Sequence, residues 1–202
     1  CGCASETFVQ TLGKSGEQVQ GLGVYDSHDG NLYITGMKQD SAVILKMTPA
    51  GTVIWTRTFD VKDGENDYIS EIIVDSEGFL VGCGQSGTLQ PGVSGFVFRY
   101  NPATNIMQWI NTYGLESPNV AGLVELPNGN YLIYDNPNKA TNDSRMLEIT
   151  RPDGTILNSS VLSQKLNLGV AENFNSALIH NGKLYGVGRY TNGLNVTDMR
   201  HA

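Results

Sequence analysis

The sequence of 202 residues lacks the features that would place it in several large classes of protein. No stretch approaches the roughly 18 consecutive apolar residues that indicate a transmembrane helix. Only 16% of the residues are charged, the formal net charge is −7, and the 13 lysine and arginine residues are scattered. Nucleic-acid binding depends on clustered positive charge that neutralises phosphates, so this composition argues against a nucleic-acid partner.

Motifs that carry common chemistries are also missing. The chain has no Gly-x-Ser-x-Gly turn, no phosphate-binding loop and no His-Glu-x-x-His pair. Its three cysteines include no Cys-x-x-Cys, and Cys83 lies in an apolar run, which indicates a small buried side chain. His28 and His180 occupy equivalent places in a repeated hairpin, so we expect solvated residues at both and no histidine-based catalysis.

The sequence does contain one pattern that occurs four times. A turn of the Asp-Gly or Asn-Gly kind, replaced once by Glu-Gly, recurs among β-type residues with its glycine at Gly30, Gly78, Gly129 and Gly182. These glycines are 48, 51 and 53 residues apart. Such turns join hairpin strands, and four strands at this period are typical of β-propeller blades. The sequence therefore predicts an all-β propeller of four-stranded antiparallel blades.

The repeat divides the chain into three complete blades and partial blades at the termini. We expect complete blades at about residues 18–60, 67–113 and 119–162, and a partial blade at 173–202. Residues 5–13 match the last strand of a blade. Two interpretations remain open: a four-bladed ring that this N-terminal strand closes, or a fragment of a longer propeller. We favour the fragment, because the last blade stops where its third strand should begin.

Three aromatic residues follow the last turn of successive repeats. Trp55 and Trp109 stand at the same point of their blades, and Phe8 takes this position in the N-terminal strand. We expect the two tryptophans to be buried in equivalent positions between adjacent blades. They are structural anchors, and the sequence assigns no catalytic residue.

Acidic residues recur just before each innermost strand, in phase with the blade period. They are Glu17, Glu65, Asp67, Glu116 and Glu172. The connections that lead into the innermost strands of a propeller gather round one opening of its channel, so these residues should share one rim. Carboxylates gathered there can bind a hard cation such as Ca²⁺, or a polyol. The alternative, which we favour, is that each carboxylate caps its own loop by accepting backbone N–H bonds.

The blade pattern resembles the secreted bacterial β-propeller repeats (SBBP-like blades). The resemblance is carried by Asp29–Gly36, Asp40–Lys46 and Gly51–Trp55. It implies an exported or surface-attached protein with adhesion or immunoglobulin-like modules beside the propeller, and it implies no reaction. The segment Gly51–Trp55 is also similar, more weakly, to the docking element of quinone-dependent dehydrogenase propellers. Because the tryptophan packs between blades in both families, this second resemblance implies architecture more than a cofactor.

The leading interpretation is a non-catalytic scaffold or adhesion-type binding module of an exported or cell-surface bacterial protein. We expect a protein or carbohydrate ligand to bind through loops on one face, where segments 85–94 and 135–143 are long and polar and 37–40 is short. Neighbouring domains of a larger polypeptide are further expected partners, and Ca²⁺ is the only cofactor that the pattern allows. The alternative is a secreted propeller enzyme acting on carbohydrate. It needs two carboxylates about 5–10 Å apart over the channel mouth, one with a raised pKa.

Overall fold

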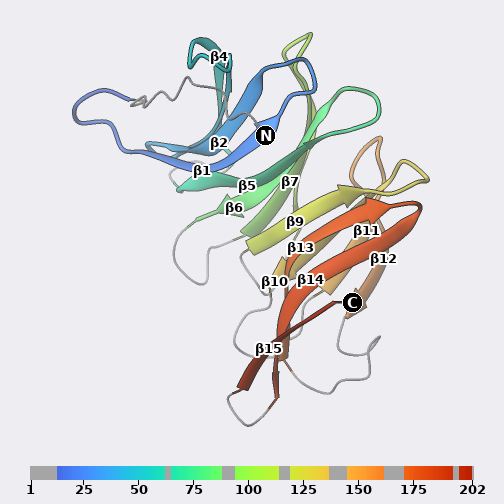
Figure 1. Ribbon diagram of the computed structural model, residues 1–202. Helices are drawn as coiled ribbons and strands as arrows, with labels where there is room; N and C mark the ends of the chain where they lie inside the picture. Colours follow the sequence, from blue (N-terminus) through green and yellow to red (C-terminus); the bar gives the residue numbers. More distant parts are fainter. Residues whose placement is uncertain are drawn as a thin grey trace, which may run out of the picture.

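The computed structural model describes residues 13–61, 65–87, 94–113, 119–136, 145–161, 171–192 and 196–201. In these ranges the regular structure consists of strands, which form four antiparallel sheets one after another along the chain (Figure 1). Each strand pairs with the next strand in the sequence, so every sheet is a simple meander. We call the sheets blades 1 to 4. Within the described residues no helix is long and apolar enough to cross a membrane.

The strand bounds follow the repeat. Blade 1 contains β1 (Val19–Asp26), β2 (Leu32–Lys38), β3 (Ser41–Met47) and β4 (Val53–Phe59). Blade 2 contains β5 (Asp67–Val74), β6 (Leu80–Ser86), β7 (Ser94–Asn101) and β8 (Ile106–Tyr113). Blade 3 contains β9 (Asn119–Glu125), β10 (Tyr131–Asn136), β11 (Arg145–Ile149) and β12 (Ile156–Val161). Blade 4 contains β13 (Ala171–His180), β14 (Lys183–Asn192) and β15 (Val196–His201).

Blade 4 is more complete than the sequence pattern predicts. We expected a third strand only beginning near residue 197, but β15 pairs with β14 over six residues and makes a three-stranded sheet. The strands β13 and β14 are also longer than expected, with ten residues each. The N-terminal strand expected at residues 5–13, which includes Phe8, lies outside the described residues apart from Gly13, so closure of a ring by this strand stays a prediction.

The core lies between neighbouring blades. One cluster joins blades 1 and 2 and contains Ile44 and Tyr33 of blade 1 with Phe98 of blade 2. A second cluster joins blades 2 and 3 and contains Val97 with Leu147. The first strands β1, β5, β9 and β13 pack against one another in this order. Because both faces of an internal blade are covered, its middle strands are continuous apolar runs, as the sequence predicts.

A bulge interrupts the first strand of every blade at the same point. The residue left out of the pairing is Leu22, Ser70, Ala121 or Asn175 in blades 1 to 4. Beside the bulge the second strand approaches the first very closely. A Cβ atom added to Gly36 would lie 1.9 Å from the Gln20 carbonyl oxygen, and one added to Gly84 would lie 2.0 Å from the Tyr68 carbonyl oxygen. Glycine is therefore required near the end of β2 and β6.

Replacing Gly36 with alanine should consequently lower the free energy of unfolding by at least about 1–3 kcal/mol, the usual cost of overpacking. The contact is with backbone, so neither partner can turn aside. Gly21 provides a matched control, since it pairs directly with Gly36 and its own added Cβ would meet nothing within 4 Å. Gly21→Ala should be neutral or slightly stabilising. Urea unfolding of both variants measures the difference, and equal effects would contradict the close approach.

Candidate functional site

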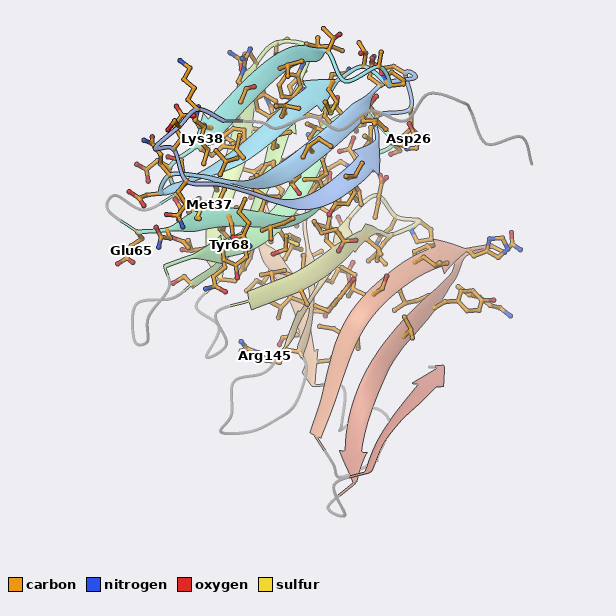
Figure 2. The ribbon with its side chains drawn as sticks, turned by 60° about the vertical axis from the view of Figure 1, so that its left-hand side comes forward. Asp26, Met37, Lys38, Glu65, Tyr68 and Arg145 are labelled. Atoms are coloured by element: carbon orange, nitrogen blue, oxygen red, sulfur yellow. The ribbon has the colours of Figure 1, made fainter. Side chains whose placement is uncertain are left out.

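One rim of the molecule carries the starts of the innermost strands, and we call it the entry rim. Figure 2 shows Lys38, Met37, Glu65, Tyr68 and Arg145 on this side of the molecule, away from Asp26 at the far end of β1. The strands β1 and β5 begin two residues after the predicted site residues Glu17 and Glu65, respectively. The rim is thus built from equivalent points of successive blades.

Glu17 is held by its own loop. Its Oε2 atom accepts a hydrogen bond from the backbone N–H of Lys14 at 3.1 Å and forms an ion pair with Lys38 at 3.3 Å. The Lys14 N–H, assisted by Lys38, lowers the pKa of Glu17 below its usual value. This carboxylate therefore has the local contacts of a loop cap, with a cationic neighbour that reduces its attraction for a metal ion.

Asp67 faces the interior of the protein. It is fully buried, and its Oδ2 atom accepts a hydrogen bond of 2.6 Å from the backbone N–H of Val61. Its own backbone N–H donates to the carbonyl oxygen of Asp40 in blade 1 at 2.9 Å. Asp67 thus ties the beginning of blade 2 to two points of the preceding segment, which is a structural arrangement.

The structure describes the other three acidic residues in less detail. Glu65 lies partly exposed on the entry rim. Glu172 is the second residue of β13 and its backbone pairs with Tyr190, while Glu116 lies outside the described residues. Within the described part of the chain no three His, Cys, Asp or Glu side chains gather as metal ligands. A ligand-binding role for the acidic residues stays a prediction.

A chain of hydrogen bonds that sequence reasoning missed stiffens the rim in blade 2. The Tyr68 hydroxyl donates to Gln85 Oε1 at 2.6 Å, and Gln85 Nε2 donates to the Gly87 carbonyl oxygen at 2.7 Å. The Gly87 N–H donates in turn to the carbonyl oxygen of Asn66 at 2.8 Å. The ends of β5 and β6 are therefore fixed to each other where they meet the rim.

The opposite rim, at the turns between first and second strands, carries a polar pair that recurs in three blades. The residue before the turn glycine contacts a residue on the third strand. The pairs are Asp29–Lys46 at 2.5 Å, Glu77–Arg99 at 2.5 Å and Asn128–Glu148 at 3.1 Å. The position is constant while the charges change, so the pair is a structural element of the repeat.

Between blades 2 and 3 this pair becomes part of a buried cluster. Asp75 Oδ2 accepts hydrogen bonds from Arg99 Nε at 3.0 Å and from the Tyr131 hydroxyl at 2.7 Å. Its Oδ1 atom accepts the backbone N–H groups of Glu77 and Phe79, both at 2.9 Å. Burial alone would raise the pKa of Asp75, but these hydrogen bonds and the arginine charge outweigh it and lower the pKa.

Arg151 extends the cluster to the surface. Its Nη1 atom lies 2.7 Å from Glu77 Oε1, its Nη2 atom contacts Glu125, and its Nε atom donates to the Gly129 carbonyl oxygen at 2.7 Å. Glu125 also accepts the Ser76 N–H at 2.8 Å. Because these groups satisfy one another across the blade boundary, the cluster serves to fix blade 3 on blade 2.

Glu71 is a partly buried carboxylic acid at the boundary between blades 2 and 3. Its Oε2 atom accepts the Leu123 N–H of blade 3 at 3.3 Å, and a Cβ on Gly122 would lie 2.2 Å from the same oxygen. Burial raises the pKa of Glu71, while its hydrogen bonds to Leu123 and Tyr134 partly oppose this effect. The absence of a side chain on Gly122 leaves the space that Glu71 fills.

The raised pKa gives a testable pH dependence. In the folded state Glu71 binds its proton more tightly than in the unfolded chain, so its contribution to stability falls as pH rises from its ordinary pKa through the folded-state value. Glu71→Gln keeps an acceptor oxygen without the charge. We expect this variant to melt at a higher temperature than the wild type at pH 7, and the difference to disappear near pH 4. A difference that grows toward acid would contradict this assignment.

The two tryptophans have the same register but different surroundings. Trp55 pairs with Lys46 and Trp109 with Arg99, which are equivalent positions of β3 and β7. Trp109 is buried against Tyr131 and donates its indole N–H to the Arg151 carbonyl oxygen at 2.9 Å. Trp55 is only partly buried, beside Tyr33. Both tryptophans thus stand at the expected equivalent position, but the expected burial is met by Trp109 and only in part by Trp55, which packs against the cluster between blades 1 and 2.

The structure agrees with the expected burial of Cys83 and with the expected exposure of His28 and His180. Cys83 is buried as a free thiol whose sulfur lies 3.7 Å from the Val120 carbonyl oxygen, and burial raises its pKa well above the usual value. His28 and His180 are exposed at their hairpins.

Comparison with known proteins defines the class of protein by its fold. The chain is similar to one in a solved structure described as Drosophila Plexin A in complex with Semaphorin 1b, with 12% identity and a TM-score of 0.59. The match covers 95% of this chain and 38% of that one, so the chain spans well under half the length of its structural neighbour. No family model and no curated protein matches. The fold is a β-propeller of four-stranded antiparallel blades, and this likeness shows the fold alone.

Proposed function

We propose that the chain is a non-catalytic binding module whose entry rim recognises another protein. The observation that carries the proposal is the placement of polar side chains on the entry rim. Lys38 at the end of β2, and Glu65 and Tyr68 around the start of β5, lie there on a rigid framework, which is how binding surfaces are built on such scaffolds. The ion pair of Lys38 with Glu17 and the hydrogen bond of Tyr68 with Gln85 hold two of these side chains in place.

Two further observations support a protein ligand. The structural neighbour is described as a complex of Plexin A with Semaphorin 1b, a case of one protein bound to another. The connections at the entry rim also differ in length from blade to blade, so the surface they form is specific to this chain. The resemblance of the blades to secreted bacterial repeats supports an extracellular or cell-surface location and an adhesion role.

A matched pair of charge reversals tests this proposal. The 202-residue chain is screened by surface plasmon resonance against an array of extracellular proteins and a glycan array. Glu65→Lys lies on the entry rim and Asp26→Lys on the opposite rim, and each changes the charge by the same amount. We expect a protein ligand whose affinity falls at least about tenfold for Glu65→Lys and stays unchanged for Asp26→Lys.

Three outcomes would contradict the proposal. They are an equal loss of affinity in the two variants, binding confined to glycans, and hydrolysis of a polysaccharide in a parallel activity screen. The last outcome would favour the carbohydrate-enzyme alternative. Circular dichroism of both variants confirms that they are folded before binding is compared.

A further inference from the structure

Two of the repeated turns contain the same dipeptide, Asn-Gly, in different backbone conformations. Asn128–Gly129 lies between β9 and β10, and Asn181–Gly182 lies between β13 and β14. An asparagine that precedes glycine can lose its side-chain amide, because glycine has no Cβ atom to hinder attack by its own backbone nitrogen. This nitrogen must give up its proton to attack, so a hydrogen bond from its N–H to a carbonyl oxygen opposes the reaction. The two turns differ in this bond.

The first of these turns restrains both groups that would react. The Gly129 N–H donates to the Leu126 carbonyl oxygen at 2.8 Å. The Asn128 side chain is held at both ends, since its Oδ1 atom accepts the Asn130 N–H at 3.0 Å and its Nδ2 atom donates to Glu148 Oε1 at 3.1 Å. The attacking nitrogen and the amide carbon are therefore both restrained in the folded protein.

The second turn leaves the attacking nitrogen without such a bond. His180 pairs directly with Lys183, so Asn181 and Gly182 form a two-residue hairpin loop, with φ angles of 50° and 70°. In a loop of this type the ladder hydrogen bonds join the flanking residues. Among the described residues no backbone carbonyl oxygen accepts the Gly182 N–H. Both loop residues are exposed, and Asn181 Nδ2 lies 3.1 Å from the exposed His180 ring at Nε2.

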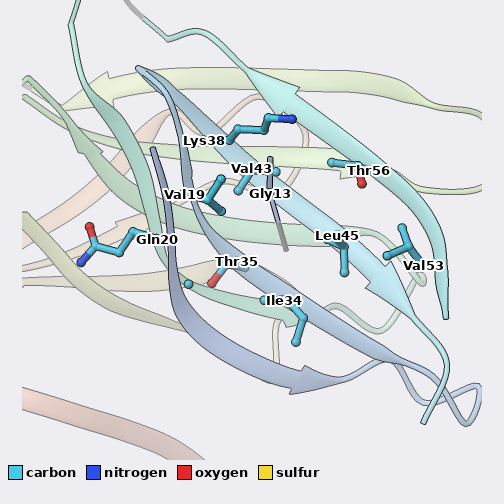
Figure 3. A pocket seen from close by; sticks show the side chains of 11 residues that line it. Gly13, Val19, Gln20, Ile34, Thr35, Lys38, Val43, Leu45, Val53 and Thr56 are labelled. Carbon is cyan, nitrogen blue, oxygen red and sulfur yellow. The ribbon is translucent and has the colours of Figure 1, made fainter. Parts of the chain in front are cut away.

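The exposure of this turn is a property of its rim. The turn glycines Gly30 and Gly78 of blades 1 and 2 are exposed at the same point of the repeat. The groove of about 520 Å³ on blade 1, lined by Val19 and Val53 (Figure 3), is a different case, because its exposure follows from the place of blade 1 at the start of the sequence. The state of the Gly182 N–H follows from the two-residue loop to which it belongs.

We propose that Asn181 is a site of spontaneous deamidation that the folded structure favours over Asn128. The Gly182 nitrogen loses its proton and attacks the Asn181 Cγ atom. The C–N bond of the side-chain amide breaks, and its nitrogen leaves as ammonia with a proton from solvent in place of the one released. The product is a cyclic succinimide. Water then opens the ring at either of its two carbonyl carbons, which gives aspartate or isoaspartate, so water is the only co-reactant.

The two products have different effects on blade 4. Aspartate keeps the backbone unchanged, and an acidic residue already precedes the turn glycine in blades 1 and 2, as Asp29 and Glu77. Isoaspartate routes the main chain through the side-chain carbon, so the loop gains one backbone atom. A two-residue loop matches the twist of its flanking strands only with regular backbone geometry. Isoaspartate at position 181 should therefore loosen the pairing of β13 with β14.

Peptide mapping by mass spectrometry, after incubation of the full chain in mildly alkaline buffer, tests the proposal. Each deamidation replaces NH with O and raises the mass of its peptide by about 1 Da. We expect Asn181 to react at least about tenfold faster than Asn128, because each hydrogen bond that restrains Asn128 and Gly129 slows the reaction by a factor of a few. Asn181→Gly should remove the signal, since a Gly-Gly loop keeps the same turn.

Two controls separate the folded structure from the local sequence. In concentrated urea both Asn-Gly pairs lose their turns, so the two rates should become similar. Glu148→Ala frees the Nδ2 end of Asn128 and leaves the Gly129 N–H bonded, so Asn128 should still react about fivefold more slowly than Asn181. Hydrogen exchange in β13 and β14 should be faster in the aged protein than in fresh protein, with no change in β9 and β10.

Three results would overturn the proposal. They are equal rates at the two asparagines in the folded chain, an Asn181 that stays intact in the folded chain while it reacts in urea, and a rate difference that persists unchanged in urea. The last result would assign the difference to the flanking residues of the sequence and not to the two turns.

Discussion

Replacing Asp75 with alanine is expected to lower the free energy of unfolding by about 3–5 kcal/mol, the usual cost of removing one partner from a buried ion pair. The Arg99 side chain is only 7% exposed and would lose its buried carboxylate partner, keeping only Glu77, whose side chain is 49% exposed. The Tyr131 hydroxyl and the backbone N–H groups of Glu77 and Phe79 would lose their acceptor as well. Urea unfolding measures the loss.

Asp29→Ala is the matched control for this prediction. Asp29 pairs with Lys46 on the same rim, but its side chain is 49% exposed whereas that of Asp75 is fully buried. Exposed pairs contribute about 0–1 kcal/mol, so this variant should lose little stability. Similar losses in the two variants would contradict the assignment of Asp75 as the buried centre.

The Asp75 effect should also depend on pH. The pKa of Asp75 is lowered in the folded state, so its contribution is present above the ordinary value of 3.8 and is lost as pH falls through the folded-state pKa. We therefore expect the difference between Asp75→Ala and the wild type to shrink in acid. This trend is opposite to the one expected for Glu71.

The second large effect is expected for Trp109→Ala, at about 3–5 kcal/mol. The substitution removes the ring that packs against Tyr131 between blades 2 and 3, and leaves the Arg151 carbonyl oxygen without the indole N–H. Trp55→Ala should cost less, because Trp55 is partly exposed at the equivalent place. Trp109→Phe retains most of the ring volume and should lose about 1 kcal/mol with the hydrogen bond. Equal losses at Trp55 and Trp109 would contradict the difference in burial.

The architecture could be predicted from the sequence because it is repeated. Each blade has its own turn glycine, and blades 1 to 3 each have an apolar third strand, so several weak signals at one period support one another. The glycine near the end of β2 and β6 belongs to the pattern for a physical reason, since it lies beside the bulge of the first strand. Local turn chemistry and the blade period are therefore sufficient to indicate the fold.

The polar contacts could not be predicted in the same way. Asp75, Arg99 and Tyr131 come from three strands or turns up to 56 residues apart, and their equivalents in the first blade and its neighbour are Ser27, Lys46 and Leu80. A search for features in phase with the repeat passes over such residues because they depart from it. These departures from the repeat are the signal in the sequence that could have identified the cluster. A charged residue in place of serine at a repeated position requires a particular neighbour.

The acidic residues of the entry rim show what a periodic position in the sequence leaves undetermined. Glu17 lies near the surface with Lys38, whereas Asp67, two positions further along the repeat, is buried and accepts the Val61 N–H. A periodic position fixes the rim on which a residue lies. It does not fix the direction of the side chain, which depends on whether a local N–H is free to receive it.

The polar pairs differ from blade to blade, so each boundary between blades has its own set of polar contacts. Apolar positions such as Ile72 and Leu123 are interchangeable between blades, so apolar packing alone would allow blade 3 to dock on blade 1. In that wrong order Tyr131 and Arg151 would face Ser27 and Asp29. Ser27 has no carboxylate that could replace Asp75 as the acceptor. The polar groups on the rim opposite the entry rim are therefore satisfied only when the correct blades are neighbours, which favours the correct blade order while a repetitive chain folds.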